Sequence, residues 1–256
     1  MPVAIYGPFH RELVTAMAFE EYYTEEQGSV RIFADQASRF AKDVAGDFNP
    51  LHNSDARRFC VPGDLLFALV LARFGLYQRM TFRFHSMVGD KALLQFRQNG
   101  SGVLTVEAEA GKLCLEAGHE GEVTKDDSVV EGFARRYVAF SGLNFPHYLK
   151  PLFEEKGVMF NPHRPLVIYD SMDFALNELP SEEPGVEFAD GSLDVEGKRG
   201  VVRFEFRMKS GEDVVGAGSK KLIIGGLIPY DAKLMDDTIT VFNRMKAVYE
   251  DGKQKS

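Results

Sequence analysis

The sequence contains no tryptophan and only two cysteines, Cys60 and Cys114, which lie far apart in the chain. This spacing fits neither a redox motif nor a cysteine metal site, so we expect both thiols to be reduced and buried. The histidines show no metal-ligand spacing, and no Walker or dinucleotide-binding fingerprint occurs. We therefore expect no metal ion and no bound cofactor.

Long apolar runs are also missing. The longest, residues 65–72, is far too short to cross a bilayer. Residues 1–7 lack the basic region and following apolar run of a secretory signal. We therefore expect a cytoplasmic protein without a membrane span. The net charge of −8 argues against general binding of nucleic acids.

What the chain does have is length and apolar bulk. Its 256 residues can form one large domain or two small ones, and 45% of them are hydrophobic, including 21 phenylalanines. The charge is uneven, because residues 57–97 contain seven basic and two acidic side chains. These basic residues are either ordinary solvated charges or a rim for coenzyme A phosphates or an acidic carrier protein.

The segment most suggestive of chemistry is residues 45–52, with the sequence A-G-D-F-N-P-L-H. Asp47 and His52 are five positions apart, a spacing that does not share a helix face, and Pro50 keeps Asn49 out of the helical region. The segment is therefore predicted to be a shaped loop, which can bring the two side chains together around a water molecule. An Asp/His pair of this kind can act as general acid and base. The alternative is structural, with Asp47 capping the preceding helix or making an Asx turn.

Residues 46–52 match the pattern G-D-x-N-P-[LI]-H, which resembles the signature of the MaoC-like hydratases and dehydratases. The resemblance covers roughly residues 30–100. It implies a hotdog fold that acts on fatty acyl thioesters, with Asp47 and His52 as the catalytic pair. The reaction implied is reversible addition of water to a 2-enoyl thioester. Coenzyme A or the phosphopantetheine of an acyl carrier protein would serve as substrate carrier only.

Two positions depart from the family pattern. Arg58 stands where the family usually has a small residue, and Pro62-Gly63 replaces a His-Gly pair after a shorter loop. The identity of the substrate is what these departures put in question. Two other functions therefore stay open: a thioesterase of the same fold, which would direct an Asp-activated water at the carbonyl, and a non-catalytic protein that binds acyl thioesters.

Five residues are expected to bind the substrate. The backbone N–H groups of Gly63 and Asp64, at the start of a helix, are suited to stabilise the thioester oxygen. Asn49 is expected to shape the loop and to contact the water or the thioester. Arg57 and Arg58 would form part of the basic rim for the carrier.

The predicted fold is α+β, with two tandem hotdog units, in each of which an antiparallel sheet wraps a central helix. Residues 1–140 would carry the motif, and residues 141–256 would form a degenerate second unit ending in a helix. The two units would form an internal pseudo-dimer, so the chain is expected to be a monomer or a homodimer. Residues 141–147 echo the motif faintly and are interpreted as structural.

Apolar periodicity and Gly, Asn and Asp breakers give the expected elements. The expected helices are residues 35–45, a central helix at residues 64–79, a second central helix at residues 143–153, and residues 231–249. The expected strands are residues 80–87, 92–98, 102–110, 112–117, 129–140, 166–176, 186–195, 199–209 and 214–224.

Overall fold

The computed structural model describes residues 19–180 and 184–253. In the first half the elements are η1 (Glu20–Tyr22), β1 (Thr24–Glu26), β2 (Ser29–Arg31), α1 (Ala34–Asp43), η2 (Pro50–His52), α2 (Gly63–Phe74), β3 (Leu76–Phe84), β4 (Leu93–Gln98), β5 (Leu104–Ala108), η3 (Glu109–Gly111) and β6 (Lys112–Thr124). In the second half they are α3 (Asp127–Gly142), a π-helical turn η4 (Asn144–Tyr148), α4 (Leu149–Lys156), β7 (Val158–Met159), β8 (Val167–Leu176), β9 (Gly185–Glu196), β10 (Arg199–Ser210), β11 (Asp213–Gly225), β12 (Ile228–Pro229) and α5 (Ala232–Lys253).

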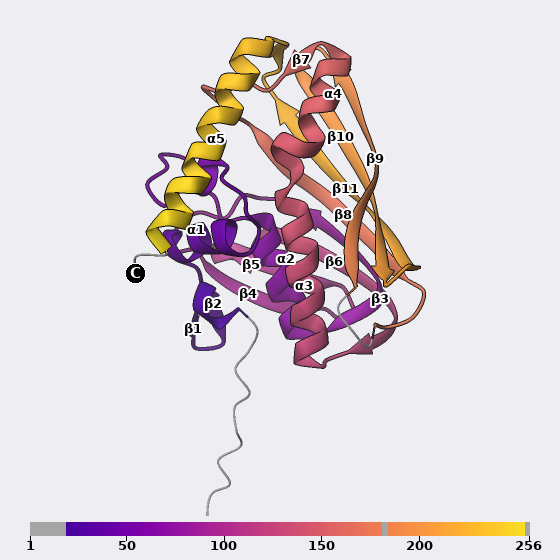
Figure 1. Ribbon diagram of the computed structural model, residues 1–256. Helices are drawn as coiled ribbons and strands as arrows, with labels where there is room; N and C mark the ends of the chain where they lie inside the picture. The colour runs from indigo at the N-terminus through magenta and orange to yellow at the C-terminus, as the bar shows by residue number, and fades with distance from the viewer. Residues whose placement is uncertain (1–18, 181–183, 254–256) are drawn as a thin grey trace, which may run out of the picture.

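One antiparallel sheet runs through both halves, in the order β1-β2-β4-β5-β6-β3-β8-β11-β10-β9 (Figure 1). The order is symmetric about the β3–β8 pair, because β4-β5-β6-β3 on one side corresponds to β9-β10-β11-β8 on the other. The two central strands are in register from the pair Arg79 and Ala175 to the pair Arg83 and Ser171. A long helix precedes the central strand in each half, α2 before β3 and α3 before β8. This is the arrangement of two hotdog units joined edge to edge.

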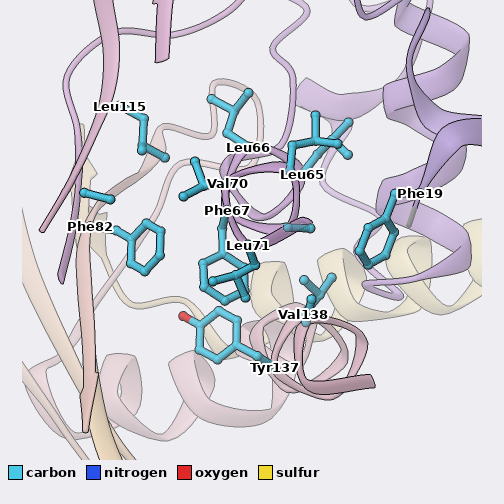
Figure 2. Packing of buried hydrophobic residues seen from close by; sticks show 14 of the residues in the cluster. Phe19, Leu65, Leu66, Phe67, Val70, Leu71, Phe82, Leu115, Tyr137 and Val138 are labelled. Atoms are coloured by element: carbon cyan, nitrogen blue, oxygen red, sulfur yellow. The ribbon is translucent and has the colours of Figure 1, made fainter. Parts of the chain in front are cut away.

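The central helices α2 and α3 pack against each other inside the curve of the sheet. The helix α2 is apolar on nearly every face, and Leu65 to Leu71 are all buried, as expected for a helix enclosed by protein. Figure 2 shows Phe67 of α2 between Phe82 of the sheet and Tyr137 of α3, with ring centroids 5.0 and 4.7 Å away. The core is therefore shared by the two halves.

Glycine ends α2 for a steric reason. Gly75 has a φ of 98°, and its N–H donates to the carbonyl of Leu71. A Cβ at this position would lie 2.7 Å from the carbonyl oxygen of Thr124. The chain can therefore turn directly into β3 only with glycine here. The central helix predicted for residues 64–79 is correct in place but too long, since it ends at Phe74.

The prediction of a strand at residues 129–140 is wrong, because this segment lies in α3. Its valines and aromatic residues favour a strand by propensity, but Val130, Ala134, Tyr137 and Ser141 are buried at helical spacing. Asp126 caps the helix by accepting from the N–H groups of Ser128 and Val129.

The second central helix is therefore α3 and not residues 143–153, which form η4 and the start of α4. The division of the chain into residues 1–140 and 141–256 remains a prediction, and residue 140 lies inside α3.

The other predicted elements are confirmed, with ends shifted by a few residues at most sites. The strand predicted at residues 112–117 is too short, because β6 continues to Thr124. The C-terminal helix is present as α5, which runs from the second half across to α1 of the first half (Figure 1). Over the residues that the structure describes, no helix combines the length and the apolar character needed to cross a membrane.

Candidate functional site

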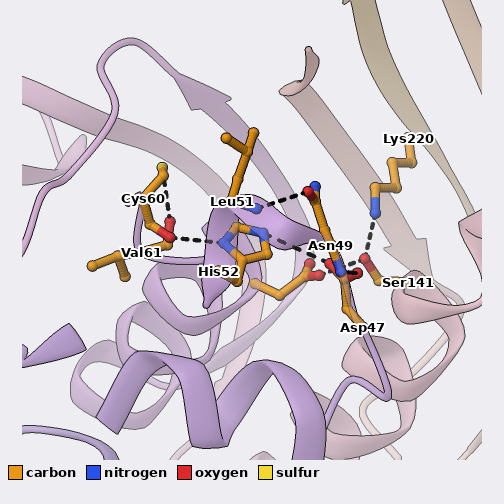
Figure 3. Close-up of polar contacts among 9 residues, drawn as sticks. Asp47, Asn49, Leu51, His52, Cys60, Val61, Ser141 and Lys220 are labelled. Atoms are coloured by element: carbon orange, nitrogen blue, oxygen red, sulfur yellow. Dashed lines mark hydrogen bonds and ion pairs between the residues drawn. The ribbon is translucent and has the colours of Figure 1, made fainter. Parts of the chain in front are cut away.

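A cavity of about 570 Å³ lies between the two halves and contains the predicted motif in its wall. Its lining comes from residues 47–52, the first turn of α2, the end of α3, the strands β8 and β11, and α5. Most of this lining is apolar. Its polar side chains gather together, and Figure 3 shows Asp47, Asn49, His52, Ser141 and Lys220 directed toward one region. The site thus has a polar end within an apolar chamber.

The motif loop is held by bonds between its own side chains and backbone. Gly46 has a φ of 63°, which lets the chain leave α1, and the N–H of Asp47 donates to the carbonyl of Ala41 at 2.8 Å. Oδ1 of Asp47 accepts from the N–H of Asn49 at 2.8 Å, and Oδ1 of Asn49 accepts from the N–H of Leu51 at 3.1 Å. The Asx-turn interpretation of Asp47 is therefore correct, and it uses only one of the two carboxylate oxygens.

The free oxygen of Asp47 faces the imidazole of His52. The distance from Oδ2 to Nε2 is 3.7 Å, too long for a direct hydrogen bond but short enough for both atoms to contact one small group. The other ring nitrogen, Nδ1, lies 2.7 Å from the carbonyl oxygen of Cys60. A carbonyl can only accept, so Nδ1 carries a proton and Nε2 is the nitrogen presented to the cavity. The structure brings together the two residues that the sequence predicted as a catalytic pair.

Cys60 contributes its main chain to this arrangement. Burial raises the pKa of its thiol to about 11, so the thiol is protonated at neutral pH and is a poor nucleophile. The sulfur donates to the carbonyl of Val61 at 3.3 Å. Both cysteines are free, with Cys114 buried and Cys60 partly buried.

Gly63 lines the cavity, and its lack of a side chain has a packing reason. A Cβ here would lie 3.0 Å from Cδ1 of Tyr169 and 3.1 Å from Cε1 of Phe84. These two rings stack at a centroid distance of 4.4 Å. In the first turn of α2 the N–H of Leu65 donates to the carbonyl of Pro62 at 3.1 Å. The N–H groups of Gly63 and Asp64 have no carbonyl of the helix before them to accept their hydrogens.

Asp64 does more than start the helix. It is only 9% exposed, and its Oδ2 accepts from the hydroxyl of Ser141 at 2.6 Å. The Ser141 hydroxyl in turn accepts from the ammonium group of Lys220, which is 1% exposed and lies 4.2 Å from the ring centroid of Tyr169. Asp64, Ser141 and Lys220, referred to below as the buried relay, come from α2, α3 and β11.

The charges of the buried relay offset each other. Burial raises the pKa of Asp64, while the positive charge of Lys220 and the hydrogen bond from Ser141 oppose this rise. Burial lowers the pKa of Lys220, and the negative charges of Asp64 and Asp47 oppose that change. Each group therefore favours the ionised form of the other.

Sequence reasoning did not identify Ser141 or Lys220 as site residues. A signal for Lys220 was present, because it has the same strand parity as Leu222 and Ile224, which are both buried. A lysine on the inner face of a strand indicates a buried partner. For Ser141 no comparable signal exists, since its segment was interpreted as a structural echo of the motif.

Arg57 and Arg58 are exposed in the loop before α2, and neither lines the cavity. Their predicted contact with a carrier stays a prediction, as do the substrate-binding roles of Asn49, Gly63 and Asp64. In the described ranges, no group of three or more His, Cys, Asp or Glu side chains is placed to hold a metal ion.

Comparison with solved structures finds a broad likeness to several proteins. The tesB protein MAP1729c of Mycobacterium avium subs paratuberculosis aligns with a TM-score of 0.45 and 11% identity, over 79% of this chain and 95% of that one. A conserved protein of unknown function with hot dog fold from Alicyclobacillus acidocaldarius aligns with a TM-score of 0.45 and 9% identity, over 83% of this chain and 98% of that one. A MaoC-like dehydratase aligns with a TM-score of 0.39 and 12% identity, over 80% of this chain and 99% of that one. Scores below 0.5 at these identities decide nothing about activity, and the fold assignment rests on the sheet and helices of this chain.

No curated protein sequence matches this chain significantly. One family model does match, over residues 17–233, which is most of the chain. Its description is "Protein of unknown function (DUF3581)". The chain therefore belongs to the DUF3581 family.

Proposed function

We propose that this protein catalyses the reversible addition of water to a 2-enoyl thioester, carried by coenzyme A or by an acyl carrier protein. The observation that carries the proposal is the Asp47–His52 pair. Oδ2 and Nε2 face each other at 3.7 Å in the cavity wall, while Oδ1 and Nδ1 are held by backbone groups. The pair is thus preorganised to hold one water molecule between its two free atoms.

We assign Asp47 as the base and His52 as the acid. As the water oxygen bonds to C3 of the substrate, Oδ2 of Asp47 takes one of its protons. The π electrons move toward the thioester carbonyl, and the N–H groups at the start of α2 stabilise the resulting enolate oxygen. When the enolate collapses, Nε2 of protonated His52 delivers a proton to C2. A proton then passes from Asp47 to Nε2, which restores the resting pair.

The apolar part of the cavity would hold the acyl chain. It is walled by β8, by the segment around Phe160, and by the inner face of α5, where Leu234, Val241 and Phe242 line the chamber. A volume of about 570 Å³ is in the range of pockets that enclose whole small ligands. We therefore include linear acyl groups of several carbons among the proposed substrates. Arg57 and Arg58, at the surface outside the chamber, are proposed contacts for the phosphates of the carrier.

The test is to incubate the protein with crotonyl-CoA and hexenoyl-CoA. Hydration is measured as the loss of enoyl absorbance, and free thiol is measured in parallel. Asp47→Asn is nearly isosteric but cannot accept the proton, and His52→Gln cannot deliver one at neutral pH. Each variant should lose on the order of 10²-fold in rate while staying folded. The double variant should lose little more than the worse single one, since the residues act as a unit.

Asp55→Asn is the matched control, because Asp55 is exposed in the following loop and does not line the cavity. It should retain wild-type activity. Release of thiol without loss of alkene would identify a thioesterase instead. Binding of enoyl thioesters without turnover would identify a binding protein. Hydration that survives in both the Asp47 and His52 variants would remove the basis of the proposal.

A further inference from the structure

We propose that Asp64 is a third catalytic residue of this site, whose Oδ1 accepts a hydrogen bond from the reacting water and from the 3-hydroxyl group formed from it. Ser141 and Lys220 are positioning residues that hold Asp64 for this task. The inference rests on the proposed function, because it assigns the second proton of the same water molecule.

The first observation is a buried oxygen without a donor. Asp64 is only 9% exposed, its Oδ2 accepts from Ser141, and no described residue donates to its Oδ1. A buried carboxylate oxygen is strongly destabilised unless it accepts a hydrogen bond. Asp64 lines the same cavity as Asp47 and His52, and the charges of both act on it. We assign this place to a hydroxyl or water at the polar end of the cavity.

The second observation is how firmly Asp64 is held. The hydrogen of Ser141 goes to Oδ2 of Asp64, and Lys220 donates to the oxygen of Ser141, so the cation acts on the carboxylate through the serine (Figure 3). Gly142, the next residue, packs so tightly that a Cβ would lie 1.6 Å from the carbonyl oxygen of Ala45. This contact fixes the end of α3, and with it Ser141, against the chain that leads into Asp47.

A water molecule at this position can make four contacts in a tetrahedral arrangement. One proton goes to Oδ2 of Asp47, the other to Oδ1 of Asp64. One lone pair accepts from Nε2–H of His52, and the remaining lone pair points at C3. When C3 and oxygen bond, Asp47 removes its proton and the second proton stays on the oxygen. The product is a 3-hydroxyl group that donates to Asp64.

The charges at the polar end also balance in this scheme. Asp64 contributes a negative charge to the buried part of the site, and Lys220 contributes a positive one. A site with zero net charge can be buried in an apolar chamber at lower cost than one with an excess of either sign. Without Lys220 the carboxylate of Asp64 would have no compensating cation among these groups.

The test measures binding as well as rate. Affinities for 3-hydroxyhexanoyl-CoA and hexanoyl-CoA are determined by calorimetry in the His52→Gln background, where turnover should be slowed on the order of 10²-fold. The hydroxylated ligand should bind about 10-fold more tightly, the scale of a hydrogen bond to a charged group. Adding Asp64→Asn should remove this preference. Ser141 takes the amide oxygen of the new side chain, so its NH₂ group would face the substrate hydroxyl, which then has no charged acceptor at this position.

The matched control is Tyr137→Phe. Tyr137 is fully buried and its hydroxyl contacts that of Tyr169, but it does not line the cavity. This variant should keep the preference for the hydroxylated ligand and the wild-type hydration rate. Ser141→Ala is the second test, because it leaves the carboxylate in place but loosens it. It should reduce the preference only partly and lower kcat more than it raises KM.

The outcomes separate the two proposals. If the wild type hydrates enoyl thioesters and Asp64→Asn lowers the rate about 10-fold or more and removes the preference, both stand. If the wild type shows no hydration but the preference depends on Asp64, Asp64 binds a hydroxyl group of the ligand, and both the reaction and the catalytic role of Asp64 are wrong. A preference that survives Asp64→Asn, or one that is missing in the parent, would falsify the role of Asp64 while leaving Asp47 and His52 untouched.

Discussion

At the scale of single residues, the pair formed by Lys220 and Asp64 concentrates charge in the interior. The two groups are 1% and 9% exposed, and Ser141 lies between them. Removing one member of such a pair leaves the other buried and uncompensated, which typically costs about 3–5 kcal/mol. Replacing both members with neutral groups costs much less. The stability of variants at these positions is therefore a direct measure of how the charges are coupled.

We predict that Lys220→Met destabilises the fold more at about pH 8 than at about pH 5. Burial already raises the pKa of Asp64 above its ordinary 3.8, and loss of the cation raises it further. A folded-state pKa above the unfolded one gives stability that is complete below the unfolded value and is lost as pH rises through the folded value. Urea unfolding of the wild type and the variant at both pH values measures the difference.

The control for this prediction is Asp64→Asn combined with Lys220→Met, which leaves no charge in the buried relay. Its stability deficit should depend less on pH than that of Lys220→Met alone. An equal deficit at the two pH values for Lys220→Met would mean that Asp64 is not coupled to the lysine.

Residue-level reasoning from sequence found part of this site. Asp47 and His52 could be proposed from sequence because they lie in one short contiguous segment with its own turn residues. Lys220 and Ser141 could not, because they reach the cavity only through the pairing of β11 with β8 and the packing of α3 on α2. Contacts between distant segments have no local pattern to reveal them.

At the scale of elements, α5 is the part of the second half that covers the motif loop. Phe242 packs edge-on against Phe48, which lies between Asp47 and Asn49, and against Phe145, with centroids 5.8 and 5.5 Å away. Tyr249 adds a second ring against Phe48 and donates to Asp43 at 2.9 Å. The helix thus lines the cavity and packs against the motif loop at the same time.

We predict that Phe242→Ala raises KM for enoyl thioesters, by about 3- to 10-fold, and more for hexenoyl-CoA than for crotonyl-CoA. The ring forms part of the apolar wall, and each buried methylene of the substrate contributes about 0.8 kcal/mol. The control is Val248→Ala, on the outer face of α5, because Val248 is 64% exposed and does not line the cavity. Steady-state kinetics with both substrates give the comparison. A KM change of equal size for the two chain lengths would place Phe242 outside the acyl chamber.

The helix α3 marks where element prediction from sequence fails, and the reason is physical. Its valines and aromatic residues fit a strand by local preference, yet the segment packs as a helix between α2 and the strand β9. Tertiary packing outweighs propensity when a segment is buried on one helical face. Strands that alternate in exposure, such as β10, follow their pattern closely, because the two faces of a sheet select residues at a period of two.

At the scale of the whole molecule, the two units are alike in topology and different in chemistry. The symmetric strand order about β3 and β8 repeats the plan, but only the first unit carries the G-D-x-N-P-L-H loop. The second unit supplies Lys220, β8 and α5 to the same cavity. One cavity is thus lined by residues from both halves of the chain.

This shared construction predicts that the molecule unfolds as one cooperative unit. The halves are joined by the β3–β8 strand pair, by the packing of α2 on α3, and by the buried relay, so unfolding one would expose a large apolar surface of the other. The chain has no tryptophan, which allows single reporters to be introduced: Tyr77→Trp in the first half and Phe188→Trp in the second. Both replaced rings are partly exposed aromatic residues, so the substitutions should be tolerated. Fluorescence of each variant should give the same urea midpoint as circular dichroism. Midpoints that differ between the two reporters would show that the units unfold separately, and the cavity between them would then be a junction of independent domains.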